Sequence, residues 1–399
     1  MQANIDTTAP LAGEAGAGKP KPVKMAAKLA YRNLFHDRLS LTVTLVGIVF
    51  SVVLVAVQCG LYIGAERMIA AMLDKSEGDL WIVPYGTKSF DDPTFLMGHE
   101  KYAVLSTPGV EGAEDLVVGF SAWRKPGGGT TTVLLVGSDH TEGSLKPWNL
   151  VEGSLNDLRG PAAVAVDDTY FADLGVNKIG DIAEVNNMRV KVAAVTHGIR
   201  SFTTLPYIFT SLPRARTLLD ASANQASYTL VRLAPDADPD QVRSDLKDRL
   251  KDREVLAQAE FRQRSVDYWL FQTGAGAALI AGAALGMIVG IVIVAQTLYS
   301  STKDHLNEFA TLRALGASAN YVYKVILIQA MLSAVIGYAI GMILSMLVIW
   351  ASKDTTMSIV MTPGLAVLLF GLTIGMCAIA AVSAIFKVTR IDPAGVFSR

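Results

Sequence analysis

Four long apolar runs constrain this chain more than any other feature of its sequence. They cover residues 40–63, 273–298, 323–350 and 363–386. Each is longer than the roughly 20 residues that a helix needs to cross the hydrocarbon core of a bilayer. We therefore expect four transmembrane helices, and a long polar segment between the first and the second.

The composition supports membrane insertion and excludes several other classes. Of the 399 residues 51% are hydrophobic, and the mean hydropathy is +0.37. A formal net charge of -1 gives no support for a nucleic-acid partner, because phosphate binding needs concentrated lysine and arginine. The two cysteines, Cys59 and Cys377, both lie inside apolar runs, so neither a disulfide framework nor a thiolate metal site is indicated.

The distribution of basic residues predicts the orientation in the membrane. Lysine and arginine precede the first run, lie between the second and third, and follow the fourth, whereas the loop 351–362 holds only Lys353 beside Asp354. By the positive-inside rule, the N-terminus, the segment 299–322 and the C-terminal residues 387–399 are cytoplasmic. The loop 351–362 and the long segment 64–272 are then expected on the outer side.

The N-terminal region contains an incomplete phosphate-binding motif. Residues 1–22 are rich in Ala, Gly, Pro and Thr, and we expect a disordered cytoplasmic tail. Gly13–Lys19 matches the first part of a phosphate-binding loop, but Pro20 stands where Ser or Thr should bind magnesium, so no nucleotide site is expected. Residues 23–39 predict an amphipathic helix at the lipid surface, the alternative being a plain basic flank of the first span.

The segment 64–272 reads as a helical stalk followed by an α+β domain. Helical periodicity continues past the first span, which predicts a stalk outside the membrane. Lys125–Gly129 is a hairpin turn signal, and Asp238 followed by Pro239 predicts a helix over 239–253. The expected strands are 80–84, 117–124, 130–137, 163–166, 182–185, 189–195, 207–210 and 228–233, with a short helix over 170–174.

The second span carries a stripe of small residues. Every fourth position is glycine or alanine, namely Gly274, Ala278, Gly282, Gly286 and Gly290. Such a stripe lets another helix approach closely. The partner is either the same helix of a second subunit, which we prefer, or another helix of the same chain.

The segment 299–322 is a short, charged segment between the second and third spans. Read as a helix, it places Leu306, Phe309 and Arg313 on one face at helical spacing. A short helix held between two spans can pass a push from a soluble partner into both.

The sequence contains no recognisable arrangement of catalytic residues. The sequence has no HExxH, CxxC or GxSxG motif. Asp167 and Asp168 are neighbours along a predicted strand and point to opposite faces, and His197 and Ser201 lack an orienting partner. We therefore expect no catalytic residue, no cofactor and no metal, and the protein is not expected to be an enzyme.

Several segments resemble the permease subunits of MacB, DevC and FtsX type, the type VII ABC transporter family. Leu29–Leu54 resembles the family's amphipathic helix and first span, Glu308–Ser318 its cytoplasmic loop, Thr389–Phe397 its C-terminal signature, and Ala163–Val195 part of its periplasmic domain. The segment after the first span is most similar to the DevC-like branch.

The resemblance implies an α+β membrane protein with four transmembrane helices and a large α+β periplasmic domain inserted between the first and second. It implies a homodimer or a pseudo-dimer of two different permease chains in the inner membrane of a Gram-negative cell. ATP is expected to be bound by a separate ATPase subunit, since no ATPase domain precedes the first span. The coupling residues implied are Leu306, Glu308, Phe309, Leu312, Arg313, Leu315 and Gly316.

The expected function is export of a lipid, glycolipid, peptide or drug-like cargo by mechanotransmission, in which ATP hydrolysis moves the periplasmic domains. A membrane-fusion protein, an outer-membrane channel and membrane lipids are further expected partners. The alternative is an FtsX-like scaffold that passes ATPase motion to a periplasmic hydrolase or signalling partner.

Overall fold

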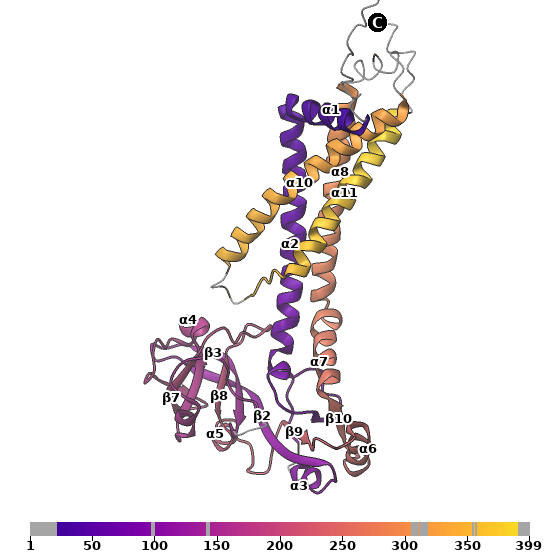
Figure 1. Ribbon diagram of the computed structural model, residues 1–399. Coiled ribbons are helices and arrows are strands. Elements are labelled where there is room, and N and C mark those ends of the chain that lie inside the picture. The colour runs from indigo at the N-terminus through magenta and orange to yellow at the C-terminus, as the bar shows by residue number, and fades with distance from the viewer. Residues whose placement is uncertain are drawn as a thin grey trace, which may run out of the picture. The chain divides into compact units, whose positions relative to one another are not determined.

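The computed structural model describes residues 22–96, 100–140, 144–304, 311, 318–352, 355 and 357–389. Within them, helices α1 (Pro22–His36) and α2 (Arg38–Asp74) come first, and a region rich in strands follows (Figure 1). Three long helices then follow: α8 (Ala275–Asp304), α10 (Ala319–Ala351) and α11 (Pro363–Thr389). In the described part of the chain, α2, α8, α10 and α11 are the four helices long and apolar enough to cross a membrane.

The long helices contain almost all of the four predicted spans. Residues 40–63 lie inside α2, which continues to Asp74 and so includes the predicted stalk. Of the run 273–298, Thr273 and Gly274 precede α8, and α8 continues six residues past Leu298 to Asp304. The runs 323–350 and 363–386 lie inside α10 and α11.

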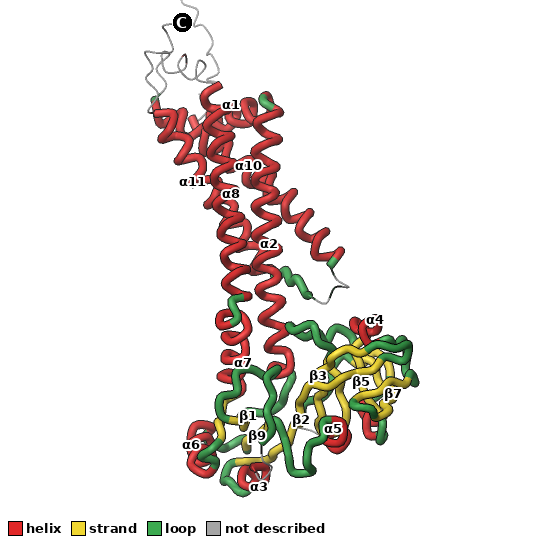
Figure 2. Tube along the Cα trace, turned by 180° about the vertical axis from the view of Figure 1, so that it is seen from behind, coloured by secondary structure: helices red, strands yellow, loops and turns green. Residues whose placement is uncertain are grey.

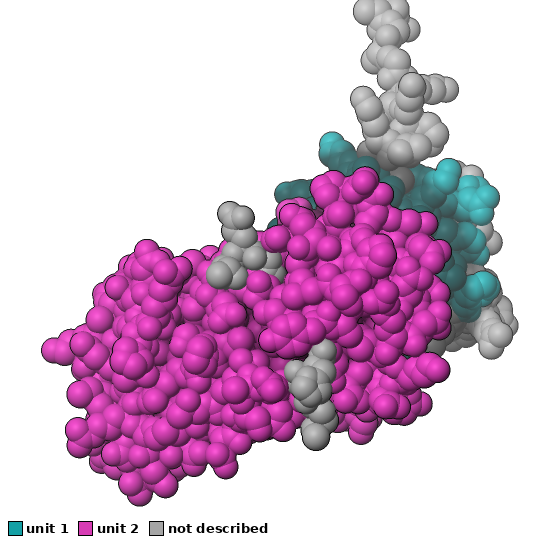
Figure 3. Space-filling view, turned by 90° about the horizontal axis from the view of Figure 1, so that it is seen from below, with its two compact units in different colours: residues 1–52, 287–341, 370–399 teal, residues 53–286, 342–369 magenta. Residues whose placement is uncertain are grey.

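The chain divides into two compact units (Figure 3). Unit 1 comprises residues 1–52, 287–341 and 370–399, and unit 2 comprises residues 53–286 and 342–369. Unit 1 is a helical bundle, and unit 2 contains all the strands of the described residues.

Small side chains allow close helix packing in unit 1. The buried cluster there is rich in alanine and joins α1, α2, α8, α10 and α11. Gly337 and Gly341 of α10 lie directly against α2, where a Cβ on Gly341 would come within 2.8 Å of Val52. Because lipid is as apolar as these side chains, close packing rather than the hydrophobic effect holds such helices together.

Unit 2 is built on one strongly bent sheet. In the described residues ten strands follow the order β10-β1-β9-β2-β3-β8-β5-β7-β4, with β6 pairing with β2 and β7. The strands are β1 (Leu80–Pro84), β2 (Val110–Arg124), β3 (Thr130–Ser138), β4 (Leu150–Glu152), β5 (Ala163–Asp167), β6 (Ile182–Val185), β7 (Met188–Thr196), β8 (Tyr207–Ser211), β9 (Tyr228–Leu233) and β10 (Arg253–Ala257).

Strand β2 belongs to two lobes at once (Figures 1 and 2). Its first half pairs with β9 in the first lobe, and its second half, from Val117, pairs with β3 in the second lobe. The first lobe also holds α3 (Glu100–Leu105) and α6 (Pro239–Arg249). The second holds η1 (Leu155–Arg159), η2 (Asp168–Tyr170), α4 (Phe171–Leu174) and α5 (Leu212–Leu218).

An aromatic cluster joins the sheet to the helices that enter the domain. Trp81, Phe90, Tyr228 and Phe261 are all fully buried, and Trp81 makes edge contacts with the other three at centroid distances of 5.4–6.1 Å. Phe261 belongs to α7 (Gln258–Asp267), which continues into the π-helical turn η3 (Tyr268–Gln272). Met72 and Leu73 of α2 are part of the same buried cluster.

The predicted elements of the domain are confirmed with some corrections. The hairpin at Lys125–Gly129 closes through a Lys125 N–H to Gly129 O bond of 3.0 Å, and the Asp238 side chain caps α6 as expected. The helix over 239–253 is wrong beyond Arg249, because residues 253–257 form the edge strand β10. Strand β2 begins at Val110, seven residues before the predicted start.

Candidate functional site

The predicted coupling segment 299–322 includes the end of α8 and the start of α10. The predicted coupling residues Leu306, Glu308, Phe309, Leu312, Arg313, Leu315 and Gly316 lie outside the described residues. Both ends of the segment are anchored in unit 1, because Leu298 near the end of α8 and Val322 near the start of α10 belong to the same buried cluster. Thr302 is also buried, and its hydroxyl donates to Leu298 O at 2.6 Å.

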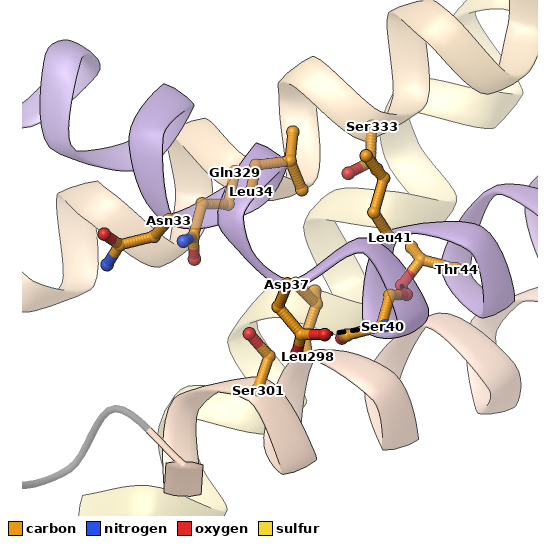
Figure 4. A pocket seen from close by; sticks show the side chains of 10 residues that line it. All are labelled: Asn33, Leu34, Asp37, Ser40, Leu41, Thr44, Leu298, Ser301, Gln329 and Ser333. Atoms are coloured by element: carbon orange, nitrogen blue, oxygen red, sulfur yellow. Dashed lines mark hydrogen bonds between the residues drawn. The ribbon is translucent and has the colours of Figure 1, made fainter.

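A small polar cavity lies beside these anchors (Figure 4). It is lined by side chains from α1, the α1–α2 corner, α2, α8 and α10, and its volume is about 10 Å³, the size of one water molecule. Asp37 Oδ1 caps the corner by accepting from Ser40 N–H at 3.1 Å. Asn33 Nδ2 and Ser333 Oγ are buried without a protein partner in the described structure.

Side chains of the amphipathic helix α1 line this cavity together with side chains of α8 and α10, the two helices on either side of the coupling segment. Ala30 of α1 is fully buried in the cluster of unit 1, whereas Tyr31 and Phe35 are exposed and their rings are 4.5 Å apart. Burial on one side and exposed aromatic residues on the other fit a helix between a bundle and a lipid surface.

The small-residue stripe of α8 faces α2 of the same chain. A Cβ on Gly286 would come within 3.0 Å of Leu54, and one on Gly290 within 2.6 Å of Ser51 Oγ. A Cβ on Gly282 would reach Gln58 Nε2 at 2.7 Å. Gly274 has a φ of +82° and lies before α8, with no described atom within 4 Å of a Cβ there.

The membrane helices enter the strand-rich domain through two connected segments, the C-terminal part of α2 and α7. Arg262 of α7 donates to Glu66 at 3.1 Å and to Asp74 at 2.9 Å, both on α2. Four residues earlier in α7, the side chain of Gln258 donates a hydrogen bond to Leu73 O of α2. Together with the shared aromatic cluster, these bonds make the end of α2 part of the domain.

The carboxylates of the second lobe serve structure rather than acid–base chemistry. Asp167 is 1% exposed and accepts from Ile199 N–H at 2.8 Å and from the Thr196 hydroxyl at 3.0 Å. Asp168 points elsewhere and lies 2.9 Å from His197 Nδ1, a partner that the sequence did not reveal. Ser201 Oγ is bonded to Thr203 instead of His197, so the geometry forms no triad. The described residues contain no group of His, Cys, Asp and Glu that could hold a metal ion.

Two family models match the chain. The MacB-like periplasmic core domain matches residues 41–249, which is just over half of the 399 residues, and the FtsX-like permease C-terminal domain matches residues 280–393. The chain belongs to the MacB/FtsX-type permeases of ABC transporters. The two matches together include most of the four long helices and most of the strand-rich domain.

Three solved structures are similar to parts of this permease. The periplasmic region of MacB from Actinobacillus actinomycetemcomitans is 12% identical, with 49% of this chain and 96% of that one covered and a TM-score of 0.38. The extracellular domain of the ABC-type transporter YknZ from Gram-positive bacteria is 17% identical (45% and 98% covered, TM-score 0.34). A domain of a putative permease from Porphyromonas gingivalis is 15% identical (45% and 88% covered, TM-score 0.31). No curated protein sequence matches.

Membership of this family fixes the general role of the chain. It is a multi-pass inner-membrane protein and the membrane subunit of an ABC transporter, a class that works with an ABC ATPase and is generally not catalytic itself. The strand-rich region is its periplasmic domain.

Proposed function

We propose that this permease passes motion from a separate ATPase subunit to its periplasmic domain, and thereby drives export of a lipid, glycolipid, peptide or drug-like cargo. The observation that carries the proposal is the continuity of α2, which runs from Arg38 to Asp74 without interruption and ends inside the core of the domain. A helix of 37 residues is about 55 Å long at 1.5 Å per residue, enough to cross a bilayer and extend well beyond it.

The input to this motion is the predicted coupling segment 299–322. Its anchors at Leu298 and Val322 are buried in one cluster with Ile48 and Val52 of α2. A displacement of the segment therefore reaches α2 through packed side chains. The interiors of the spans offer no charged relay that would suit an ion-driven mechanism instead.

The output is the end of α2 in the periplasmic domain. Met72 and Leu73 are fully buried against the aromatic cluster, and Arg262 fastens α2 to α7. Because a packed core resists deformation, movement of α2 along or about its axis moves the lobes with it. The proposed orientation has both termini in the cytoplasm, as the basic residues indicate.

The second copy in the proposed homodimer contacts a face of α8 other than the glycine stripe. Gly282 and Gly286 already pack against α2 of the same chain. On the other side of the helix Ala277, Ala281 and Ala284 are exposed at helical spacing and form a second small-residue face. We propose this alanine face as the contact with the partner copy, with a membrane-fusion protein and an outer-membrane channel as further partners.

The test is reconstitution of the full chain with candidate ABC ATPases in nanodiscs. Glu308→Lys and Leu312→Asp are expected to abolish co-purification of the ATPase and stimulation of its activity by the permease. Asp252→Lys reverses a charge in the periplasmic domain and is the matched control, which should bind the ATPase normally. An ATPase complex that survives both coupling substitutions would refute the proposed docking.

A further inference from the structure

The loop 357–362, which precedes α11, lies directly against α2 in the same compact unit (Figures 1 and 2). Two glycines of α2 receive it, Gly60 and Gly64, which are buried and one helical turn apart. A Cβ on Gly64 would overlap the carbonyl oxygen of Ser358, and one on Gly60 would come within 2.7 Å of Ile359 Cγ2. The loop can therefore take this place only while both positions lack a side chain.

A backbone hydrogen bond fastens the loop to the helix. Val360 N–H donates to Gly60 O at 3.0 Å, and residues 358–362 are all half-buried. The bond joins main chain to main chain, so it fixes the position of the loop along α2. Glycine is less favourable than alanine inside a helix, and the backbone that packs on these two positions explains why they are glycine.

Both ends of the loop are also fixed. At its start, Thr355 Oγ1 lies 2.7 Å from Ser352 O and 3.0 Å from Met357 O, and so connects the residue after α10 to the loop. At its end, Thr362 Oγ1 accepts from Leu365 N–H at 3.1 Å and caps the first turn of α11. A short segment that is bonded at both ends and in the middle has little slack with which to absorb a displacement.

The loop lies at the end of a helix that starts at the coupling segment. Helix α10 (Ala319–Ala351) begins within the predicted coupling segment 299–322 and ends a few residues before the loop. Motion of α10 therefore reaches α2 at Gly60, further along α2 than the buried contacts of Ile48 and Val52. Coupling between distant sites is carried by such contiguous packed and hydrogen-bonded groups.

We propose that the loop 357–362 is a strap that couples α10 and α11 to α2 at the outer surface of the membrane, with Gly60 and Gly64 as the positioning residues that seat it. The loop stays on α2 through the transport cycle and moves with it. The inference rests on the proposed function, because it adds a second path by which motion from the ATPase reaches the periplasmic domain.

The first experiment tests whether the glycines hold the loop, and it uses the full-length permease in nanodiscs without any ATPase. Amide hydrogen exchange is measured for wild type, Gly64→Ala and the matched control Gly371→Ala. Both substitutions put alanine in place of a helix glycine, but no described atom lies within 4 Å of a Cβ on Gly371. Val360 N–H should exchange about 2- to 10-fold faster in Gly64→Ala, the range for loss of one net hydrogen bond, and at the wild-type rate in Gly371→Ala. Unchanged exchange in Gly64→Ala would overturn the seat.

The second experiment tests whether the seated loop transmits motion. Cys59 and Cys377 are replaced by alanine, and spin labels at the exposed position Asp252→Cys report the distance between the periplasmic domains of the two copies. The permease is combined with the ATPase that co-purifies with it and is trapped with ADP and vanadate. Trapping should shift this distance in the labelled parent and in Gly371→Ala. Gly64→Ala should bind the ATPase normally and show a shift at least 2-fold smaller, whereas a purely structural role would change its stability and leave the shift intact.

Two further variants separate a released loop from a locked one. Val360→Pro removes the N–H donor without adding atoms to α2, so it remains informative if Gly64→Ala does not fold. In Gly60→Cys/Ile359→Cys, two cysteines face each other across the close contact of these positions, and their disulfide, formed before spin labelling, locks the loop on α2. The locked variant should keep the full shift, because the loop does not have to leave the helix.

A full shift in both Gly64→Ala and Val360→Pro, with the loop released, would overturn the coupling and leave the proposed function intact. Loss of the shift in the locked variant would mean that the loop has to leave α2 during the cycle, which also contradicts the inference. Absence of any shift in the labelled parent would instead refute the proposed function, and the coupling with it.

Discussion

The clearest quantitative prediction concerns Asp91, a carboxyl buried beside the aromatic cluster. It is 5% exposed, and Oδ1 accepts a hydrogen bond from the Tyr207 hydroxyl at 2.7 Å. Burial raises the pKa of Asp91 from 3.8 to about 6, although the bond from Tyr207 acts in the opposite direction. Burial, together with the same carboxylate, holds the pKa of Tyr207 well above its usual value, so Tyr207 remains the donor.

This shift determines the sign of a pH dependence. Between pH 3.8 and about 6 the folded state keeps a proton on Asp91 that the unfolded state has lost. Folded stability therefore falls as the pH rises through this window and is level above it. At about 1.4 kcal/mol per pH unit, the ionised Asp91 costs the folded protein about 3 kcal/mol at neutral pH.

Asp91→Asn removes this cost and keeps an oxygen that can accept from Tyr207. At pH 8 we expect the free energy of unfolding to rise by about 3 kcal/mol, less any cost of an unpaired amide N–H. Below pH 4 the variant should match wild type. Asp92→Asn, at the exposed neighbouring position, is the matched control and should behave as wild type throughout.

The assay is chemical unfolding of the purified full-length protein in detergent, followed by tryptophan fluorescence from pH 3.5 to 8. Trp81 contacts Phe90, the neighbour of Asp91, and so reports on this part of the domain. Burial also raises the pKa of Glu114 and Asp115, so the difference between wild type and variant is the quantity to compare. A difference that does not change between pH 4 and pH 6 would refute the reasoning.

Two further predictions test the helices. Arg262→Ala removes the two bonds that Arg262 makes to α2. We expect a stability loss of only about 1 kcal/mol, since the pairs are partly exposed, but a clear drop in cargo transport at unchanged ATPase docking. Arg249→Ala, whose bonds reach only Ser106, should not affect transport. Gly286→Leu should lower stability in thermal unfolding by about 1–3 kcal/mol through overpacking against α2, whereas Gly371→Leu, with no described atom near its Cβ position, should not.

Local patterns were sufficient to predict the elements whose cause is local. The four apolar runs became the four long helices, and the Asp238 cap and the turn at Lys125–Gly129 are confirmed. Each of these depends on side chains within a few residues of one another. Such features can be predicted without knowledge of the rest of the fold.

Elements that depend on distant partners were missed. The start of β2 carries Glu114 and Asp115, charges that argue against a buried strand, yet Asp115 is compensated by Arg216 at 3.3 Å and by Thr229 at 3.0 Å. The helical pattern was extended to residue 253, but residues 253–257 form a strand because β1 offers an unpaired edge. In the same way, His197 gained its partner Asp168 only through the fold.

The small-residue stripe also depends on a distant partner, which is helix α2. Its period could be read from the sequence, but not that Gly282, Gly286 and Gly290 face α2. Glycine inside a helix lowers helix stability by about 1 kcal/mol relative to alanine, so closer packing with a neighbour has to offset this loss at each position. On α2 itself, the absence of a side chain at Gly60 allows the backbone of the loop at Val360 to lie against the helix. Gly60 O accepts a hydrogen bond from Val360 N–H there, at 3.0 Å. Helix α2 thus makes close contacts with α8, α10 and the loop 357–362 and ends in the domain core, as its proposed role in transmitting displacement requires.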